Sequence, residues 1–475
     1  MPDAPAPPGG HSRPDPLSRL VLAHFGVLLV VSTWAFGGQS PWARQFILWW
    51  GTLGIALFIA ASVSRRTPGE VPPAFRLLWP LWLFDVLVIA SCFNPGFREV
   101  AGAGGTSLVL GDPRGWMPTA AVPRVAAHEL WQLNGLVLSA ASLFVVLRRR
   151  SLIRGLLFLL AGNAVVLAVF GTFQQLVHSE GLWFGLVKSP NDHFFATFIY
   201  HNHWGAFALM NIAVCLALLF HHYRHGHHRA TLHSPVLLGA VLTLLLATSI
   251  PLSTSRSCTV LAAVFLLAAL GHLIVLVARR RQGGFAFGRV AGLVLAAGLA
   301  AGAIGFLGRN VIAQRLHLTT AQWTRLAQEG TSTSRLVLYQ DTWRMAKQKP
   351  WFGWGLECYG RVFPLFNTQR PVEPWFPAPV YREAHNDWLQ ALAEVGFVGT
   401  GLLVLQVIVP LLAVPWRRGS SAIPSYLLAG AGLVALYAWL EFPFANPTVL
   451  LTFCALFWCA LRYGQLDARA RTESR

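Results

Sequence analysis

A histidine followed by two spaced glycines is the strongest candidate for chemistry in this sequence. His385 and Asn386 lead into an apolar run that contains Gly396 and Gly399. If this run is one continuous helix, a rotation of about 100° per residue places His385 and both glycines on one face. Glycines on such a stripe let another helix approach closely. His385 would then be either a base at the mouth of the seam or an interfacial histidine above ordinary packing.

An arginine lies in a very short connection between two strongly apolar segments. Arg256 stands in the polar run 253–257, with apolar residues on both sides. A charged side chain at such a place is costly unless it has a partner or reaches toward water. A planar guanidinium also suits two-point contact with a phosphate. The local sequence leaves both interpretations open, a phosphate contact or an interfacial arginine.

Two further polar motifs adjoin apolar runs. His201 and Asn202 lie in the segment 200–204, where the chain enters an apolar run. His201 and His203 are two residues apart and do not share a helix face, and the sequence around them offers no carboxylate to support a metal site. The glycine-rich segment 350–360 lacks the Gly-Lys-Ser/Thr of a phosphate-binding loop and predicts a tight turn.

The elements that position these residues are predicted to cross a membrane. The chain has 475 residues, of which 55% are hydrophobic and 12% charged, whereas a soluble domain is about 25% charged. This composition excludes a soluble enzyme and a disordered protein. We predict an all-α polytopic membrane protein, because a span needs about 20 apolar residues and twelve runs qualify. Their ranges are 19–36, 45–63, 75–93, 129–147, 152–176, 204–221, 235–252, 259–278, 288–307, 388–414, 423–441 and 446–463.

The distribution of basic residues predicts the orientation. The net charge is +18, from 37 basic and 19 acidic residues. With the N-terminus inside, every short cytoplasmic loop carries at least two basic residues, which is the positive-inside pattern. Both termini are therefore expected in the cytoplasm, and a nucleic-acid partner is not needed to explain the charge. The six cysteines show neither paired spacing nor a His/Cys ligand pattern, so no disulfide framework or metal site is expected.

The spans divide the chain into five parts. A cytoplasmic tail (1–18) precedes transmembrane helices 1–9 (19–307), an extracytoplasmic loop (308–387), transmembrane helices 10–12 (388–463) and a second cytoplasmic tail (464–475). Ten basic residues of the loop outnumber its acids, which either reflects free translocation of long loops or marks a surface for an anionic ligand. Within the loop, 332–348 predicts an amphipathic helix that Pro350 ends.

The order of the motifs resembles the O-antigen ligase family, which also contains O-antigen and exopolysaccharide polymerases. The resemblance covers about 195–400 by motif and most of the chain by architecture. The histidine motif is the most specific part. The motifs, in order, are TFIYHNHW at 197–204, Ser255-Arg256, Ser334-Arg335, Pro350 with Gly353-Trp354-Gly355, and His385-Asn386 with Gly396 and Gly399.

This resemblance implies a membrane glycosyltransferase with a GT-C-like helical fold and a large extracytoplasmic loop between helices 9 and 10. Such enzymes move a glycan from undecaprenyl diphosphate to a hydroxyl of lipid A–core, of a growing glycan or of a protein, as in lipopolysaccharide biosynthesis. The reaction takes place at the periplasmic face of the bacterial cytoplasmic membrane. No cofactor, nucleotide sugar or metal is expected, and the partners are the donor, the acceptor and the bilayer.

The resemblance also assigns roles to residues. His385 corresponds to the essential histidine of the family, and Arg256 and Arg335 to its diphosphate-contacting arginines; Arg382, close to His385, is added to them. Fixed arginines stabilise a leaving diphosphate, while the histidine orients or deprotonates the acceptor, so the configuration is inverted. The supporting residues are Asn386, His201 and Asn202, with Gly396 and Gly399 as helix packing beneath the site.

Two alternatives from other classes remain. A transporter of inorganic carbon or a lipid-linked substrate should have broken spans and polar groups near the midplane in both halves, and Asp85 is the only mid-span acid. A scaffold for envelope assembly would leave the motif combination unexplained. The sequence does not separate ligase from polymerase or protein transferase, and it does not identify the glycan or the oligomeric state.

Overall fold

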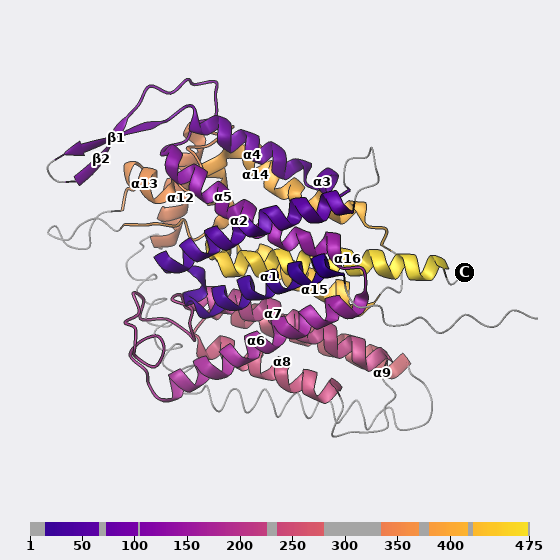
Figure 1. Cartoon of the computed structure of the whole chain (residues 1–475). Helices are drawn as coiled ribbons and strands as arrows, with labels where there is room; N and C mark the ends of the chain where they lie inside the picture. Colours follow the sequence, from indigo (N-terminus) through magenta and orange to yellow (C-terminus); the bar gives the residue numbers. More distant parts are fainter. Residues whose placement is uncertain are drawn as a thin grey trace, which may run out of the picture.

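The computed structural model describes residues 15–65, 73–102, 105–225, 235–279, 334–369, 380–416 and 421–473. Helices dominate these ranges (Figure 1), and nine of the described helices are long and apolar enough to cross a membrane. Two further apolar helices are shorter, Trp79–Cys92 and Ala422–Tyr437. The prediction of an all-α polytopic membrane protein is confirmed. The predicted span 288–307 lies outside the described residues, so twelve spans remain a prediction.

Up to residue 176, the described chain forms six α-helices, one short 3-10 helix and a hairpin. The third predicted span is divided at Leu78, because Pro80 lacks the N–H that would continue the helix from Arg76. The hairpin pairs Phe97 with Leu110. The elements are α1 Pro16–Trp34, η1 Phe36–Gly38, α2 Pro41–Ser64, α3 Pro73–Leu77, α4 Trp79–Cys92, β1 Phe97–Gly102, β2 Gly105–Leu110, α5 Pro123–Val146 and α6 Arg150–Leu176.

The rest of the described chain is also helical. The helix predicted over 332–348 is present as α12, and α16 continues beyond 463, where the predicted last span ends. The elements are α7 His201–His225, α8 Pro235–Leu252, α9 Arg256–Arg279, α12 Ser334–Gln348, α13 Tyr359–Val362, η2 Phe363–Leu365, α14 Asp387–Ala413, α15 Ala422–Tyr437, η3 Pro443–Ala445 and α16 Pro447–Glu473.

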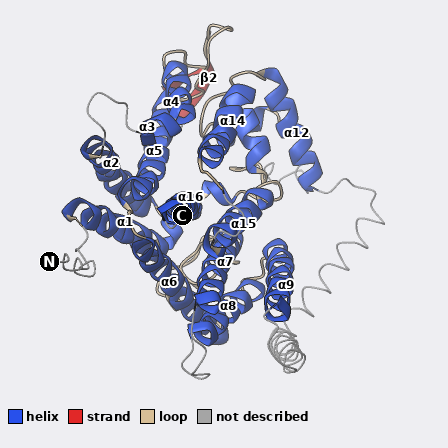
Figure 2. Ribbon diagram, turned by 90° about the vertical axis from the view of Figure 1, so that its right-hand side faces the viewer, coloured by secondary structure: helices blue, strands red, loops and turns tan. Residues whose placement is uncertain are grey.

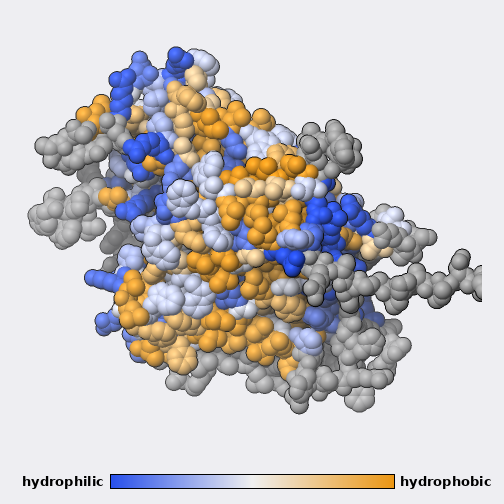
Figure 3. All heavy atoms as spheres, in the orientation of Figure 1, coloured by the Kyte–Doolittle hydropathy of each residue, from blue (hydrophilic) through white to orange (hydrophobic). Residues whose placement is uncertain are grey.

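The centre of the bundle is formed by α7 and α16, with the other helices around them (Figure 2). The apolar window of α7 is entirely buried by its neighbours. On one side α2 crosses α5 at two glycines, where a Cβ atom on Gly51 would lie 3.0 Å from the Cα atom of Gly135. In Figure 3 hydrophobic residues cover much of the middle of the molecule, as expected for a lipid-facing surface.

The two ends of the bundle differ. The first residues of α7, α14 and α16 lie at one end, together with α12, α13 and the hairpin (left in Figure 1); we call it the site end. The last residues of α2, α5 and α16 lie at the other end, which we call the arginine end. At the site end α12 packs on α14 through a small apolar core that includes Leu338, Met345 and Trp354.

Candidate functional site

The connection between α15 and α16 carries a buried acid, Glu441, at the site end. This connection is attached to the start of α14 through Asp387. The backbone N–H of Asp387 donates to Ala438 O at 2.9 Å, and the N–H of Phe444 donates to Asp387 Oδ2 at 2.9 Å. The first turn of α14 therefore fixes the position of Glu441.

His385 stands two residues before α14, in the left-handed backbone region with φ 53°. Asn386 caps the helix by accepting from the N–H of Leu389 at 3.0 Å. From α12, the Tyr339 hydroxyl donates to the carbonyl of His385 at 2.8 Å. These contacts aim the imidazole at Glu441, with His385 Nδ1 3.1 Å from Glu441 Oε2.

Arg335 reaches the same carboxylate from the first turn of α12. Its Nη2 donates to Glu441 Oε1 at 2.5 Å, and its Nη1 donates to Leu440 O at 3.4 Å. The side chain of Glu441 is only 4% exposed, whereas that of Arg335 is 50% exposed. One edge of the guanidinium therefore holds the buried acid, and the rest of it faces outward and is available to a ligand.

A chain of hydrogen bonds extends from Glu441 to the start of α9. The hydroxyl of Tyr200 donates to Glu441 Oε2 at 3.2 Å and accepts from Asn202 Nδ2 at 2.8 Å. The hydroxyl of Ser255 in turn donates to Asn202 Oδ1 at 2.7 Å. Arg256, the first residue of α9, follows Ser255 directly. The chain thus connects α12 and α14 with the segments that precede α7 and α9.

The charges of this network are set by its environment. Burial would raise the pKa of Glu441, but the hydrogen bond from His385 and the charge of Arg335 outweigh it and hold this pKa below its ordinary value of 4.5. Burial raises the pKa of Tyr200, and the nearby Glu441 raises it further. Glu441 is therefore a carboxylate at neutral pH, and Tyr200 keeps the proton that it donates.

Among the described residues, Arg256, Arg382 and His201, which were also predicted as site residues, do not join the network around Glu441. The side chains of Arg256 and Arg382 are both exposed, and the backbone of Arg382 lies beside Gly360. Within the described ranges no hydrogen bond or ion pair joins either arginine to His385. His201 turns toward His193, with its Nδ1 3.2 Å from His193 O. Of the predicted residues, the network thus unites His385, Arg335 and Asn202.

The prediction that His385, Gly396 and Gly399 share one face of a continuous helix is wrong. His385 lies outside α14, and the helix is interrupted at Gly396, where φ is 65° and ψ is −172°. A Cβ atom at Gly396 would lie 2.4 Å from the backbone of Trp351. At Gly399 a Cβ atom would lie 2.5 Å from the Val395 side chain of the same helix and 3.2 Å from Leu87 of α4.

The interruption of α14 is filled by the turn 350–355. The N–H groups of Trp354 and Gly355 donate to Ala393 O and Glu394 O at 3.0 and 2.7 Å. In return the N–H of Phe397 donates to Pro350 O at 2.8 Å. The predicted tight turn therefore supplies the backbone hydrogen bonds that the broken helix lacks, which sequence periodicity could not reveal.

Glu441 and Tyr200 are the two members of the network that were not singled out from the sequence. Acids are rare in the apolar parts of this chain, and a buried acid requires a partner. That scarcity was the available signal for Glu441. Its partners lie far away in the sequence, so only the fold identifies them. Among the described residues, no three His, Cys, Asp or Glu side chains gather into a group that could hold a metal ion.

Comparison with known proteins finds a similarity for part of the chain. Residues 241–404 match a family model described as O-antigen ligase, which is about a third of the chain. The matched range contains Arg256, Arg335, Arg382 and His385, whereas Glu441 lies beyond its end. No curated protein matches the chain significantly.

Proposed function

We propose, from the match of residues 241–404 to the O-antigen ligase family model, that this membrane protein is a glycosyltransferase that takes its glycan from undecaprenyl diphosphate. The observation that carries the proposal is the shared carboxylate of Glu441, which joins His385 and Arg335 in one site. These residues come from separate elements and have the chemistry that transfer from a diphosphate requires.

In this mechanism His385 is the base. With Nδ1–H donated to Glu441, Nε2 is left to accept the proton of an acceptor hydroxyl. The acceptor oxygen forms a bond to the anomeric carbon of the donor sugar while the bond from that carbon to the phosphate oxygen breaks. The diphosphate leaves with the bonding electrons, and the configuration of the sugar is inverted.

Arginines stabilise the leaving diphosphate. Arg335 has donors left after its bonds to Glu441 and Leu440 O, and half of its side chain is exposed. Arg256 and Arg382 are exposed at the same end of the bundle. Fixed guanidinium groups at the place where negative charge develops lower the barrier without reorganisation of solvent. We assign all three to the diphosphate.

The proposal includes the orientation of the protein in the membrane. The positive-inside pattern supports a cytoplasmic location of both termini in a bacterial cell. Since α16 runs from the site end to the arginine end, the network around Glu441 then faces the periplasm. The donor and the acceptor meet there at the outer surface of the cytoplasmic membrane.

The broken helix α14 is an observation that would favour a transporter instead, because interrupted spans hold ions in many transporters. In such a site the freed carbonyl groups face the ion. Here Ala393 O and Glu394 O accept hydrogen bonds from the turn 350–355. The interruption therefore holds the turn and supports the transferase over the transporter.

The test is glycan analysis of the parent organism after deletion of the gene and complementation. Short, uncapped lipopolysaccharide with unused polymer would identify a ligase, and single repeat units in place of long chains a polymerase. His385→Ala should fail to complement, whereas His128→Ala, which removes an exposed histidine at the start of α5, should succeed. An unchanged glycan profile in the deletion strain would contradict the proposal.

A further inference from the structure

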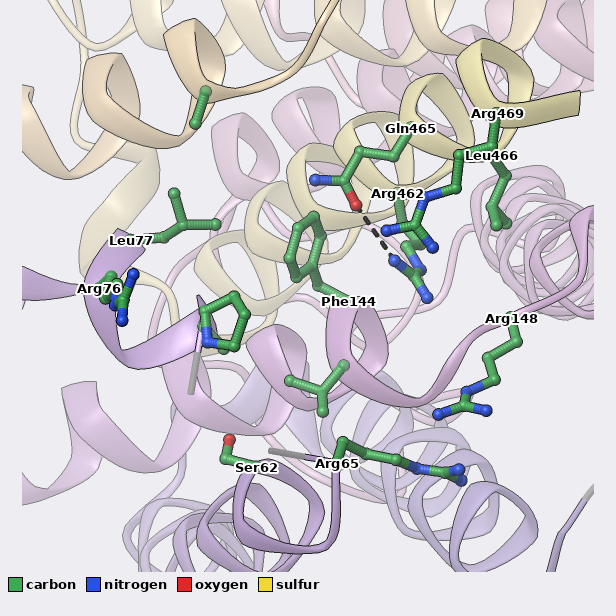
Figure 4. A pocket seen from close by; sticks show the side chains of 14 residues that line it. Ser62, Arg65, Arg76, Leu77, Phe144, Arg148, Arg462, Gln465, Leu466 and Arg469 are labelled. Atoms are coloured by element: carbon green, nitrogen blue, oxygen red, sulfur yellow. Dashed lines mark hydrogen bonds between the residues drawn. The ribbon is translucent and has the colours of Figure 1, made fainter. Parts of the chain in front are cut away.

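A cavity of about 650 Å³ opens at the arginine end, between α2, α3, α5 and α16 (Figure 4). None of the fourteen described residues that line it is acidic. Five of them are arginines. These are Arg65, Arg76, Arg148, Arg462 and Arg469.

The arginines converge from separate parts of the chain. Arg65 follows α2, Arg76 lies in α3, and Arg148 follows α5. Arg462 and Arg469 are seven residues apart on α16, so they share a face of that helix. Figure 4 shows Arg76 on one side of Phe144 and Arg148, Arg462 and Arg469 on the other. Like charges gathered in one hollow repel each other, and an anion between them would remove that repulsion.

The protein itself compensates only part of this charge. Arg65 forms an ion pair with Asp15. Arg462 donates to Leu147 O at 2.5 Å and to Gln465 Oε1 at 3.1 Å, both of which are neutral. Within the described ranges no acid pairs with the three exposed arginines of the cavity. They are Arg76, Arg148 and Arg469.

The nearest acid of α16 is already occupied. Asp467 pairs with Arg150 at 2.7 Å and accepts from the N–H of Ser421 at 3.0 Å. It does not line the cavity. Among the described residues, the positive charge of Arg76, Arg148 and Arg469 is thus not compensated by an acid.

We propose that this cavity binds a phosphate group. Guanidinium groups match the oxygens of a phosphate in geometry and in charge. The apolar side chains of Leu77, Phe144 and Leu466 line the same cavity, which suits the headgroup and upper chains of an anionic phospholipid from the surrounding bilayer. A soluble phosphate compound offers the same anion without the apolar part.

The site is separate from the proposed transferase centre. Arg462 lies fifteen residues along α16 from Pro447, or about 22 Å at 1.5 Å per residue. Phosphate binding in the cavity therefore does not depend on the proposed transferase function. Topology alone would also place arginines at this end, so the experiment must compare arginines inside the cavity with arginines outside it.

The test measures lipid binding to the purified full-length protein by native mass spectrometry in detergent. The probes are dioleoyl phosphatidylglycerol and, as a neutral control, dioleoyl phosphatidylcholine. The variant Arg148→Gln with Arg469→Gln removes two exposed cavity arginines. The matched control, Arg19→Gln with Arg279→Gln, removes two exposed arginines at the same end outside the cavity. Phosphatidylglycerol should bind the cavity variant about 30-fold more weakly than the wild type, at ~1 kcal/mol per arginine. It should bind the control variant as tightly as it binds the wild type.

A second arm distinguishes the source of the phosphate. In this arm, inorganic pyrophosphate is added and the unfolding temperature is measured. A soluble phosphate ligand would be supported if pyrophosphate raised the unfolding temperature of the wild type but not of the cavity variant, while the wild type bound both lipids equally. Equal binding of both probes by wild type and cavity variant would overturn the inference. An equal loss in the control variant would overturn it as well, since the charge of the whole end would then explain binding.

Discussion

At the scale of the residue, Glu441 organises the site. One buried carboxylate accepts hydrogen bonds from His385, Arg335 and Tyr200. The ion pair with Arg335 and the bond to His385 offset the cost of burying its charge. Glu441 touches neither the donor nor the acceptor in the proposed reaction, so it is a positioning residue that fixes the tautomer of the base and the direction of the arginine.

Glu441→Gln should lower the rate of glycan transfer by ~10²-fold or more, the range that a positioned general base contributes. The amide keeps the shape of the side chain but removes the charge that holds His385 and Arg335. Transfer can be measured with membranes and a lipid-linked donor. Glu180→Gln, which changes an exposed acid, should leave the rate unchanged. A folded E441Q protein with full activity would contradict the role of Glu441.

Stability of the purified protein should depend on pH through the same residue. The pKa of Glu441 is lowered in the folded state, so its contribution to stability is present above its ordinary pKa of 4.5 and is lost as pH falls through the lower folded value. Wild type should therefore unfold at a higher temperature than E441Q at about pH 6.5, with the gap closing toward about pH 3.5. A gap that is constant over this range would show that the charge is not responsible.

Arginine and lysine should not be equivalent at position 335. Arg335 holds Glu441 and Leu440 O with two different nitrogen atoms, which a single ammonium group cannot reproduce while it also contacts a diphosphate. Arg335→Lys should lower transfer by about tenfold or more. Arg344→Lys is the matched control, because Arg344 lies on the same helix, is equally exposed and pairs with Asp341. Equal activities of the two variants would contradict a specific guanidinium contact.

At the scale of the element, α14 and the turn 350–355 depend on each other. Gly396 and Gly353 both have positive φ, and each approaches the backbone of the other segment. A Cβ atom on Gly353 would lie 2.3 Å from the backbone of Glu394. The first part of α14, which carries Asp387 and follows His385, is therefore held in place by the turn as well as by α12.

Gly396→Ala should destabilise the protein by about 1–3 kcal/mol or more, because alanine is strained at this φ and its Cβ meets the backbone of Trp351. Thermal unfolding in detergent measures the change. Gly401→Ala is the control on the same helix, where a Cβ atom meets nothing within 4 Å; it should raise stability by about 0.5–1 kcal/mol. Equal unfolding temperatures of the two variants would show that the interruption of α14 at Gly396 does not stabilise the protein.

At the scale of the whole molecule, the bundle separates two charged regions. The Glu441 network lies at one end and the arginine cavity at the other, with the apolar helices between them. This arrangement lets one protein act on a substrate at one membrane surface while it binds phosphate at the opposite surface, as we propose.

Labelling of single cysteines tests this orientation. In a Cys92→Ser background the remaining native cysteines are buried. Val380→Cys at the site end should react with an impermeant maleimide in intact spheroplasts, because Val380 is 77% exposed. Thr472→Cys at the arginine end should react only after lysis. The reverse pattern would place the site in the cytoplasm.

The sequence by itself determined the fold class, most of the spans, the loop helix α12 and a resemblance to the O-antigen ligase family, whose model matches residues 241–404. Helical spans are readable because every hydrogen bond of a membrane helix is made within a few residues, so length and apolar content suffice. The break before Pro80 also has a local cause, since a proline removes its own donor, but the sequence analysis predicted 75–93 as one span and missed it.

Only the tertiary structure decided how the site is assembled. Glu441 contacts His385 because Asp387 holds the connection between α15 and α16. Arg335 contacts Glu441 because α12 packs on α14. The break at Gly396 exists because a turn forty residues earlier inserts its backbone there. The arginines of the cavity likewise meet from four parts of the chain. These contacts depend on the packing of segments that are distant in the sequence. Such packing produces no hydrophobic period and no motif spacing from which the contacts could be predicted.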